Sequence, residues 1–465
     1  MTPRLTTRHR MLALAGLATV ALLSGALPGA AQTMTPAAAI TGLEDPHPCP
    51  DIPDFTCATV TVPLDHSGEV PGELHLPVAV SDNEDAPRGV LLFLSGGPGQ
   101  PGVAILPRVK QTYIDPSVLD EYRLVMFDQR GTGGNAIDCA PLQGILNGSD
   151  WLYAPREPVE ACADQLGESR AYYTTPDTTD DIDLLRQALG VSKLTLDGVS
   201  YGSFTAEQYA LRYPHRVRKM VLDSVVPHIG FDPLGRDSMQ ANARVLRAVC
   251  AADPACTSDP VADLAYLVRH GYDGDRVLEA MAIISIFAPS FDGVPKLLHD
   301  ARNGDTAGWD NLLNSVLEGG TPAQFLSSGL HVATICADLT FPWGDATTPV
   351  DEREAPLKEA LDALTDHELY PYDKRTAERA QPISGCRYWP VARASDYSSR
   401  RNLPAVPTLL LNGDRDLSTP LEWALWEAKR APLGQLYVAA GAGHGTQARD
   451  PSGQAQVVAT KFLLD

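Results

Sequence analysis

Short, unbroken runs of hydrophobic residues mark the first half of the chain, and a polar or glycine-rich turn follows each of them. The clearest run is Gly89–Leu94; Tyr122–Phe127 is similar apart from Arg123, and Arg218–Leu222, which begins with two basic residues, is expected to form another buried strand. Runs of this length without alternation are typical of strands that are buried on both faces of a parallel sheet. Between them, Thr178–Leu189 places its apolar residues on one helical face and stops at Gly190. This alternation of strand and helix predicts a doubly wound α/β fold with a mostly parallel sheet.

The hydrophobic pattern differs at the two ends of this region. Near the N-terminus, Thr59–Pro63 and Leu74–Val80 are short apolar segments with a polar turn between them. Such a pair predicts an antiparallel edge of the sheet. The C-terminal part returns to alternating strands and helices, at residues 406–413, 421–430, 435–438 and 455–463.

Only helical periodicity remains between residues 227 and 393. Helices are predicted there, joined by Pro- and Gly-rich turns, at Met239–Ala251, Val261–His270, Asp275–Phe287, Val294–Ala301 and Glu354–Leu364. A block of helices inserted between sheet strands predicts a cap domain. The predicted organisation is a sheet domain in two parts, residues 46–226 and 394–465, with the helical cap 227–393 between them.

The first 31 residues have the pattern of a secretory signal peptide. Three arginines precede an apolar stretch, Met11–Leu27, and small residues near Ala31 offer a cleavage site. The alternative is an N-terminal membrane anchor, for which the apolar stretch is slightly short. Residues 32–45 are expected to form a loose segment before the globular fold begins near Pro48. We therefore expect an exported protein, periplasmic or secreted, that leaves the membrane after signal cleavage.

The charge of the chain argues against two classes of partner. The formal net charge of −21 at pH 7 should repel nucleic acid and anionic membranes. The acidic excess has two interpretations: it serves solubility, or it attracts cationic substrates such as peptides with free amino termini.

The eight cysteines fall into four neighbouring couples. In an exported chain such couples suggest disulfide bonds. The predicted couples are Cys49 with Cys57, Cys139 with Cys162, Cys250 with Cys256, and Cys336 with Cys386. None has metal-ligand spacing with nearby histidines, so no metal site is expected.

One stretch, Gly198-Val199-Ser200-Tyr201-Gly202, is a candidate nucleophile turn between a strand and a helix. In such an elbow the serine hydroxyl is lifted above the sheet, and the two glycines let strand and helix pack closely. The pattern alone is weak, because roughly one chain in six of this length and composition contains it by chance. Ser200 as an ordinary turn serine is therefore the alternative that the rest of the chain has to exclude.

A serine nucleophile needs a histidine base and an acid that orients the base. In the chain order Ser, acid, His, Asp416 follows one predicted strand and His444 follows the next. Two other carboxylates compete for the acid role: Asp414 in the same loop, and Asp223 at the end of the strand after the elbow. Asp416 is the preferred acid.

An oxyanion hole requires two fixed N–H donors near the nucleophile. The amide of Tyr201, directly after the serine, is one candidate. The other is the amide of Gly97, in the Gly-rich turn that follows the strand Gly89–Leu94. A plain glycine turn after a strand is the alternative for Gly97.

Several motifs together resemble a known family. They are Gly96–Gly99, Asp128–Gly133, Gly198–Gly202, Gly413–Pro420, Gly443–His444 and Cys386–Pro390. Together they resemble the proline iminopeptidase and tripeptidyl-aminopeptidase branch of the serine α/β-hydrolases, and the resemblance covers most of the chain. Two residues depart from it: Ser95 stands where many members have His, and Tyr201 stands where proline iminopeptidases usually carry Trp. The second departure argues against strict proline specificity.

The resemblance implies an α/β-hydrolase fold with a helical cap, and an exported aminopeptidase acting on peptides with a free N-terminus. It also implies that acidic cap residues bind the substrate amine, for which Asp338 and Glu207 are the candidates; solvated surface carboxylates are the alternative for both. No metal or organic cofactor is implied. Two other functions remain open: a carboxylic ester hydrolase with the same triad, and an inactive binding protein on a hydrolase fold.

Overall fold

A twisted sheet of nine strands organises the part of the chain that the computed structural model describes, residues 42–395 and 402–465. The strands lie in the order β1-β2-β3-β5-β4-β6-β7-β8-β9. Pairs from β5 to β9 in this order are parallel, whereas β1, β2 and β3 form an antiparallel edge. The strands are β1 Glu44–Pro48, β2 Phe55–Pro63, β3 Glu73–Ser81, β4 Val90–Leu94, β5 Arg123–Phe127, β6 Leu194–Val199, β7 Val217–Asp223, β8 Thr408–Gly413 and β9 Gly434–Ala439. The predicted doubly wound sheet with an antiparallel edge is confirmed, and its first strand begins earlier than the expected start near Pro48.

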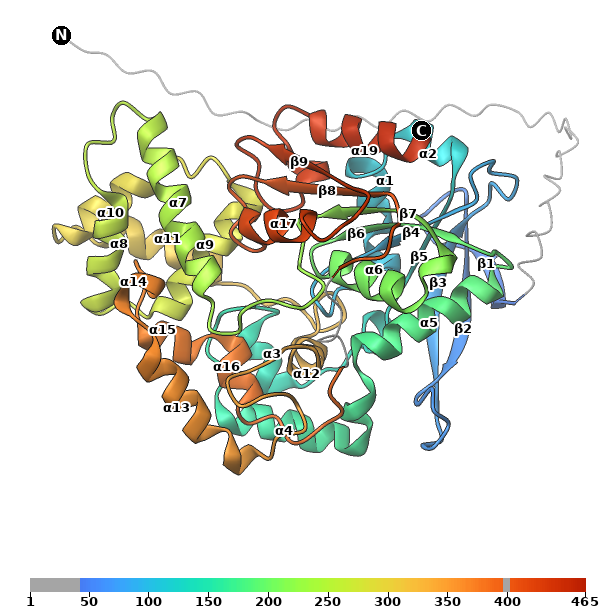
Figure 1. Ribbon diagram of the computed structural model, residues 1–465, viewed down its shortest axis with the longest axis horizontal. Helices are drawn as coiled ribbons and strands as arrows, with labels where there is room; N and C mark the ends of the chain where they lie inside the picture. Colours follow the sequence, from blue (N-terminus) through green and yellow to red (C-terminus); the bar gives the residue numbers. More distant parts are fainter. Residues whose placement is uncertain (1–41, 396–401) are drawn as a thin grey trace, which may run out of the picture. The chain divides into compact units, whose positions relative to one another are not determined.

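Helices cover both faces of the sheet (Figure 1). On one face, Leu92, Leu196 and Leu410 pack against α5 (Thr175–Ala188), α6 (Tyr201–Arg212) and α17 (Leu421–Ala428). On the other face, Leu91 and Leu409 pack against the helices α1 (Leu106–Thr112), α2 (Pro116–Glu121) and α19 (Gln454–Leu464). The parallel strands have continuous hydrophobic runs because both of their faces are buried.

Most of the remaining helices lie between β7 and β8 in the sequence. They are α7 Arg236–Ala252, α8 Pro260–Arg269, α9 Gly274–Phe287, α10 Val294–Arg302, α11 Ala307–Leu317, α12 Ser328–Asp338, α13 Glu354–Ala363, α14 Asp366–Leu369, α15 Lys374–Arg379 and α16 Gln381–Cys386. The five helices expected from periodicity are present, and α11, α12 and α14–α16 are additional. The short helix α18 (Thr446–Arg449) follows β9.

A second helical segment joins this region from earlier in the chain. The helices α3 (Ala140–Leu146) and α4 (Arg156–Leu166) lie between β5 and α5. Their buried residues, such as Leu142 and Val159, belong to the same hydrophobic cluster as Leu246 and Leu278 of the later helices. The helical region is therefore built from two insertions between strands of the sheet, whereas the sequence pattern indicated one.

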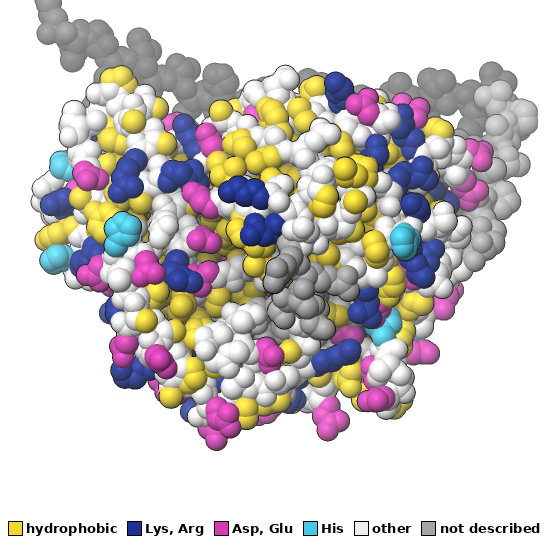
Figure 2. Space-filling view, viewed as in Figure 1, with side chains coloured by type: hydrophobic (Ala, Val, Ile, Leu, Met, Phe, Trp, Pro, Cys, Tyr) yellow, Lys and Arg dark blue, Asp and Glu magenta, His cyan; other side chains and the backbone are white. Residues whose placement is uncertain are grey.

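All four predicted disulfide couples are bonded, and no cysteine in the described ranges is free. The predicted signal peptide and most of the segment 32–45 lie outside the described residues. No helix within those residues combines the length and the hydrophobicity that a membrane span requires. Acidic and basic side chains are interspersed over the face in Figure 2, as expected of a charged, solvated surface.

Candidate active site

Ser200 lies at the turn between β6 and α6, in a backbone conformation that is rare for a residue with a side chain. Its φ is 58° and its ψ is −128°. Gly202 makes the turn possible, because a Cβ there would lie 2.2 Å from the carbonyl oxygen of Leu94. A strained serine between a strand and a helix is the geometry of a nucleophile elbow.

Ser200 and His444 line one cleft of about 500 Å³. No hydrogen bond joins the two side chains, both of which are described. Contacts of this kind are often long without substrate and tighten when substrate binds. The cleft therefore brings the serine and the histidine to one site.

The Nδ1 atom of His444 lies 3.0 Å from Oδ2 and 3.2 Å from Oδ1 of Asp416. The backbone amides of Ser418 and Thr419 each donate to Oδ1 of Asp416 at 2.9 Å, and the Thr419 hydroxyl donates to Oδ2 at 2.8 Å. Burial alone raises the pKa of Asp416, but His444 and these donors outweigh it and hold the pKa below its usual value. Burial lowers the pKa of His444, and the charge of Asp416 outweighs that effect, so its pKa is raised.

Neither competing carboxylate hydrogen-bonds to His444. Asp223 accepts the backbone N–H groups of Thr446 and Gln447 at 2.8 Å each. Asp414 accepts the backbone N–H of Gly441 at 2.7 Å. Both therefore brace the loop around the histidine, and Asp416 is its carboxylate partner.

Ser285, on α9, connects the loops that carry Asp416 and His444. Its hydroxyl accepts the backbone N–H of Leu417 at 3.1 Å, and its carbonyl accepts the backbone N–H of His444 at 3.2 Å. One residue of the helical region thus helps to position both loops.

The glycine turn after β4 lies directly against the nucleophile. A Cβ at Gly96 would lie 2.8 Å from the Cβ of Ser200, and Gly97 lines the cleft beside it. Tyr201 is the first residue of α6, so its N–H has no carbonyl partner within the helix. Both expected oxyanion donors therefore lie next to Ser200.

Asp338 and Glu207, the two carboxylates expected to bind the substrate amine, do not line the cleft. Asp338 is buried and accepts the Tyr201 hydroxyl at 2.6 Å, so it holds the side chain that directly follows Ser200. Glu207 is fully buried on α6, next to His228 and Glu427. It is not among the residues that line the cleft.

Asp150 and Glu279 line the cleft, although neither was predicted from the sequence as a site residue. The Asp150 side chain is 36% exposed, and burial within the cleft walls raises its pKa to about 7. Glu279 is more deeply buried, and burial followed by the charge of Asp150 raises its pKa to about 7. Its Oε2 accepts the Ser149 hydroxyl at 2.5 Å and the Trp151 N–H at 3.1 Å. A lone acid within the apolar run of α9 was a signal for Glu279; Asp150 lies in a loop without a motif.

A narrow side pocket of about 20 Å³ opens beside Ser200. Its walls are mainly aromatic and aliphatic, and they include Trp151, Tyr201, Phe231 and Trp423. The pocket has room for a small apolar group only.

Comparison with known proteins gives the same fold and also points to a more specific group of hydrolases. Residues 89–269 match the family model described as alpha/beta hydrolase fold, and residues 371–465 match the one described as TAP-like protein. The chain is 26% identical over 420 residues to the tripeptidyl aminopeptidase of Streptomyces lividans, covering 79% of this chain and 74% of that protein.

Two further relatives are from Mycobacterium tuberculosis. Serine protease Hip1 is 26% identical over 382 residues, covering 71% of this chain and 70% of Hip1. Carboxylesterase B is 30% identical over 223 residues, covering 43% of this chain and 42% of that protein. With the elbow and the mostly parallel sheet described above, these matches show an α/β-hydrolase fold and support a serine hydrolase of an aminopeptidase-like family.

Proposed function

We propose that this hydrolase is an exported serine aminopeptidase that cleaves peptide bonds near free N-termini. One observation carries the proposal: Ser200, His444 and the two acids Asp150 and Glu279 line a single cleft. The serine and the histidine supply the chemistry of acyl transfer, and the acids supply a site for a cation at a fixed place beside it. The names of the peptidase relatives agree with this function.

In the proposed mechanism, the Oγ of Ser200 attacks the carbonyl carbon of the scissile peptide bond while His444 takes its proton. Asp416 holds the imidazole through Nδ1 and stabilises the imidazolium that forms. The amides of Gly97 and Tyr201 donate to the oxyanion. His444 then gives its proton to the leaving amine, and the C–N bond breaks to leave an acyl-enzyme. Water, activated by His444, releases the N-terminal fragment and restores Ser200.

The acids Asp150 and Glu279 are proposed to bind the α-ammonium group of the substrate. Two neighbouring carboxylates repel each other when both are charged, and after burial this repulsion by Asp150 is the second reason for the raised pKa of Glu279. An ammonium group between them relieves that repulsion and favours ionisation of both. An uncharged acyl group offers no such gain, so the pair selects for a free N-terminus.

The side pocket is proposed to hold the side chain next to the scissile bond. Because it offers only about 20 Å³, small apolar side chains such as that of alanine fit better than large ones. A bulky side chain would have to displace Trp151 or Trp423, which are both buried.

Export is part of the proposal. Four disulfide bonds in the described residues are typical of a chain that folds in an oxidising compartment. Detection of the mature chain outside the cytoplasm, beginning near residue 32, tests this part.

The second candidate function is carboxylic ester hydrolysis, which the same triad supports and which the likeness to carboxylesterase B favours. A panel of Ala-, Pro- and tripeptidyl-anilides, each with a free and an acetylated N-terminus, separates the two when it is assayed beside short-chain esters. Acetylation should lower kcat/KM strongly. Indifference to acetylation, or turnover of esters only, would contradict the aminopeptidase proposal. Failure of a fluorophosphonate probe to label the wild-type chain at Ser200 would instead favour an inactive binding protein.

A further inference from the structure

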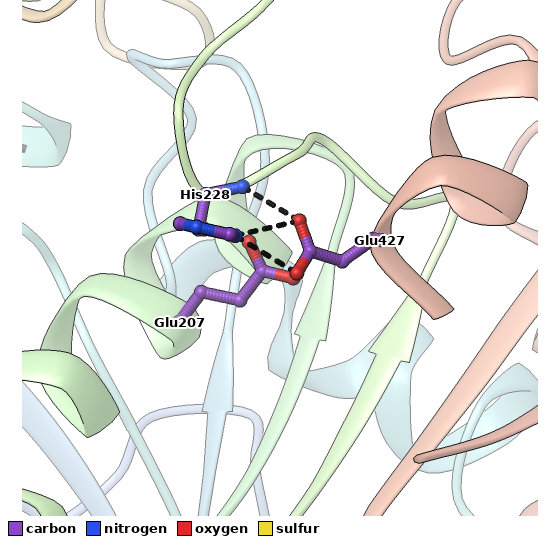
Figure 3. A group of neighbouring side chains, drawn as sticks. All are labelled: Glu207, His228 and Glu427. Carbon is purple, nitrogen blue, oxygen red and sulfur yellow. Dashed lines mark hydrogen bonds and ion pairs between the residues drawn. The ribbon is translucent and has the colours of Figure 1, made fainter. Parts of the chain in front are cut away.

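Three side chains from distant parts of the sequence meet in a buried cluster (Figure 3): Glu207 on α6, His228 on the loop after β7, and Glu427 on α17. All three residues are fully buried. Each offers one nitrogen or oxygen atom, and these atoms lie within 4.8 Å of one another. The cluster is separate from the proposed catalytic residues, since Glu207 lies seven residues, or roughly 10 Å along the helix, beyond Ser200.

Glu427 is well oriented within this cluster. One of its oxygens accepts the backbone N–H of His228 at 3.0 Å. The Nδ1 atom of His228 lies 2.8 Å from one of its oxygens and 2.9 Å from the other. The imidazole and this carboxylate are therefore held in a fixed relation.

Glu207 has no such support. Neither of its carboxylate oxygens has a hydrogen-bond partner within the described residues, although both are buried. Figure 3 shows its carboxylate facing that of Glu427. Within the described ranges, neither glutamate forms an ion pair with a lysine or an arginine. A buried carboxylate without a donor is costly unless a cation or a proton neutralises it.

We propose that Glu207, His228 and Glu427 form a structural binding site for a divalent transition-metal ion of the zinc type. Two carboxylates and one neutral imidazole are ligands that such an ion accepts. Their joint charge of two negatives is balanced by one divalent cation. Ligand atoms around a tetrahedral zinc ion lie roughly 3.4 Å apart. An ion would therefore replace the hydrogen bond between Nδ1 of His228 and Glu427, which are now 2.8–2.9 Å apart and would separate slightly, while Glu207 supplies the third ligand atom from within 4.8 Å.

The ion would connect elements that carry the proposed catalytic residues. Helix α6 starts directly after Ser200, and α17 starts directly after the loop that contains Asp416 and Thr419. A bond from each helix to one ion fixes their separation. The site thereby stabilises the fold around the triad and takes no part in the chemistry.

The sequence contains no metal-binding motif of cysteines and histidines, so it did not predict this site. Glu207 and His228 are 21 positions apart in the sequence, and His228 and Glu427 are 199 apart. Only the fold brings them together.

The test uses the full mature chain, dialysed against EDTA and then titrated with Zn²⁺ alone. We expect one equivalent of tightly bound zinc by elemental analysis and a rise in Tm of several degrees. Replacement by Co²⁺ should give the visible absorption of a nitrogen and oxygen site without a thiolate band, since the described cysteines are all in disulfides.

The variants Glu207→Gln and Glu427→Gln remove one ligand charge each with little change in shape, and both should lose the bound equivalent and the rise in Tm. Glu422→Gln is the matched control, because Glu422 is also on α17 but forms an ion pair with Arg244 at 2.7 Å; it should bind zinc as the wild type does. A wild-type chain that takes up no stoichiometric zinc overturns the proposal and assigns the neutralising charge to protons. Binding that survives in both Gln variants also overturns it. Anilide turnover is measured on the metal-free chain at low temperature. It tests the proposed peptidase function independently, so a failure to bind zinc is distinguished from a failure of that function.

Discussion

The carboxylate of Asp223 accepts the backbone N–H of Gln447 at 2.8 Å, across 224 positions of the sequence. A strand end in the first part of the sheet domain thus fixes the loop that carries His444 in the second part. Asp223 was a candidate for the triad acid. Its position gives it a different task, which is to hold the start of α18 and with it the histidine.

This arrangement predicts a ranking of three carboxylate variants. Asp416→Asn should lower kcat by about 10⁴-fold, because the histidine loses its orienting carboxylate and its tautomer. Asp223→Asn should lower kcat by roughly 10- to 100-fold through a small shift of the histidine, and Asp414→Asn should lower it least. Anilide kinetics on the three variants check the order, and full activity of Asp416→Asn would exclude it as the acid.

The proposed amine site predicts a selective binding defect. Glu279→Gln should raise KM for substrates with a free N-terminus by roughly 10- to 100-fold, the loss of a hydrogen bond to a charged group. It should leave labelling of Ser200 by a fluorophosphonate unchanged. Glu318→Gln is the control, because Glu318 also lines the cleft but is exposed. Equal KM values for the two variants would contradict the role of Glu279.

The raised pKa of Glu279 also predicts how stability depends on pH. Its pKa is about 7 in the folded chain and about 4.3 in an unfolded one. The folded state therefore binds more protons between these values, so the free energy of unfolding falls as pH rises through this window. Glu279→Gln should remove that fall and stabilise the substrate-free chain at pH 8 by about 1–3 kcal/mol. Chemical denaturation at pH 5 and pH 8 measures it; an equal effect at both pH values is the contrary outcome.

The disulfides should contribute unequally. Cys336–Cys386 joins α12 to α16 across 50 positions, whereas Cys250–Cys256 spans only 6. Loop-closure entropy predicts a loss of about 4 kcal/mol for the first and about 2 kcal/mol for the second when each pair is replaced by serine. Because α12 also carries Asp338, which binds the Tyr201 hydroxyl, only the first pair should affect activity. Thermal unfolding and anilide turnover test both parts.

The sequence was sufficient for the sheet because its strands are buried on both faces and leave continuous apolar runs, as at Val90–Leu94. It was also sufficient to bring Ser200, Asp416 and His444 to one place, since each follows a strand at the same edge of the sheet. It did not reveal which helical acids face the cleft. Asp338 turns toward Tyr201, and Asp150 reaches the cleft from a loop between α3 and α4. Such orientations depend on packing between segments that are remote in sequence. The local hydrophobic periodicity does not predict this packing.

Ser285 has a consequence for how this enzyme can be re-engineered. Its helix, α9, also carries Glu279, so the element proposed to bind the substrate amine is hydrogen-bonded to the backbone of both loops that carry the proposed acid and base. The helical region is therefore not an exchangeable module. A chimera that took this region from another hydrolase would acquire a new specificity only if the incoming helix met the loops of Asp416 and His444 with an equivalent serine; otherwise it would lose turnover together with the old specificity.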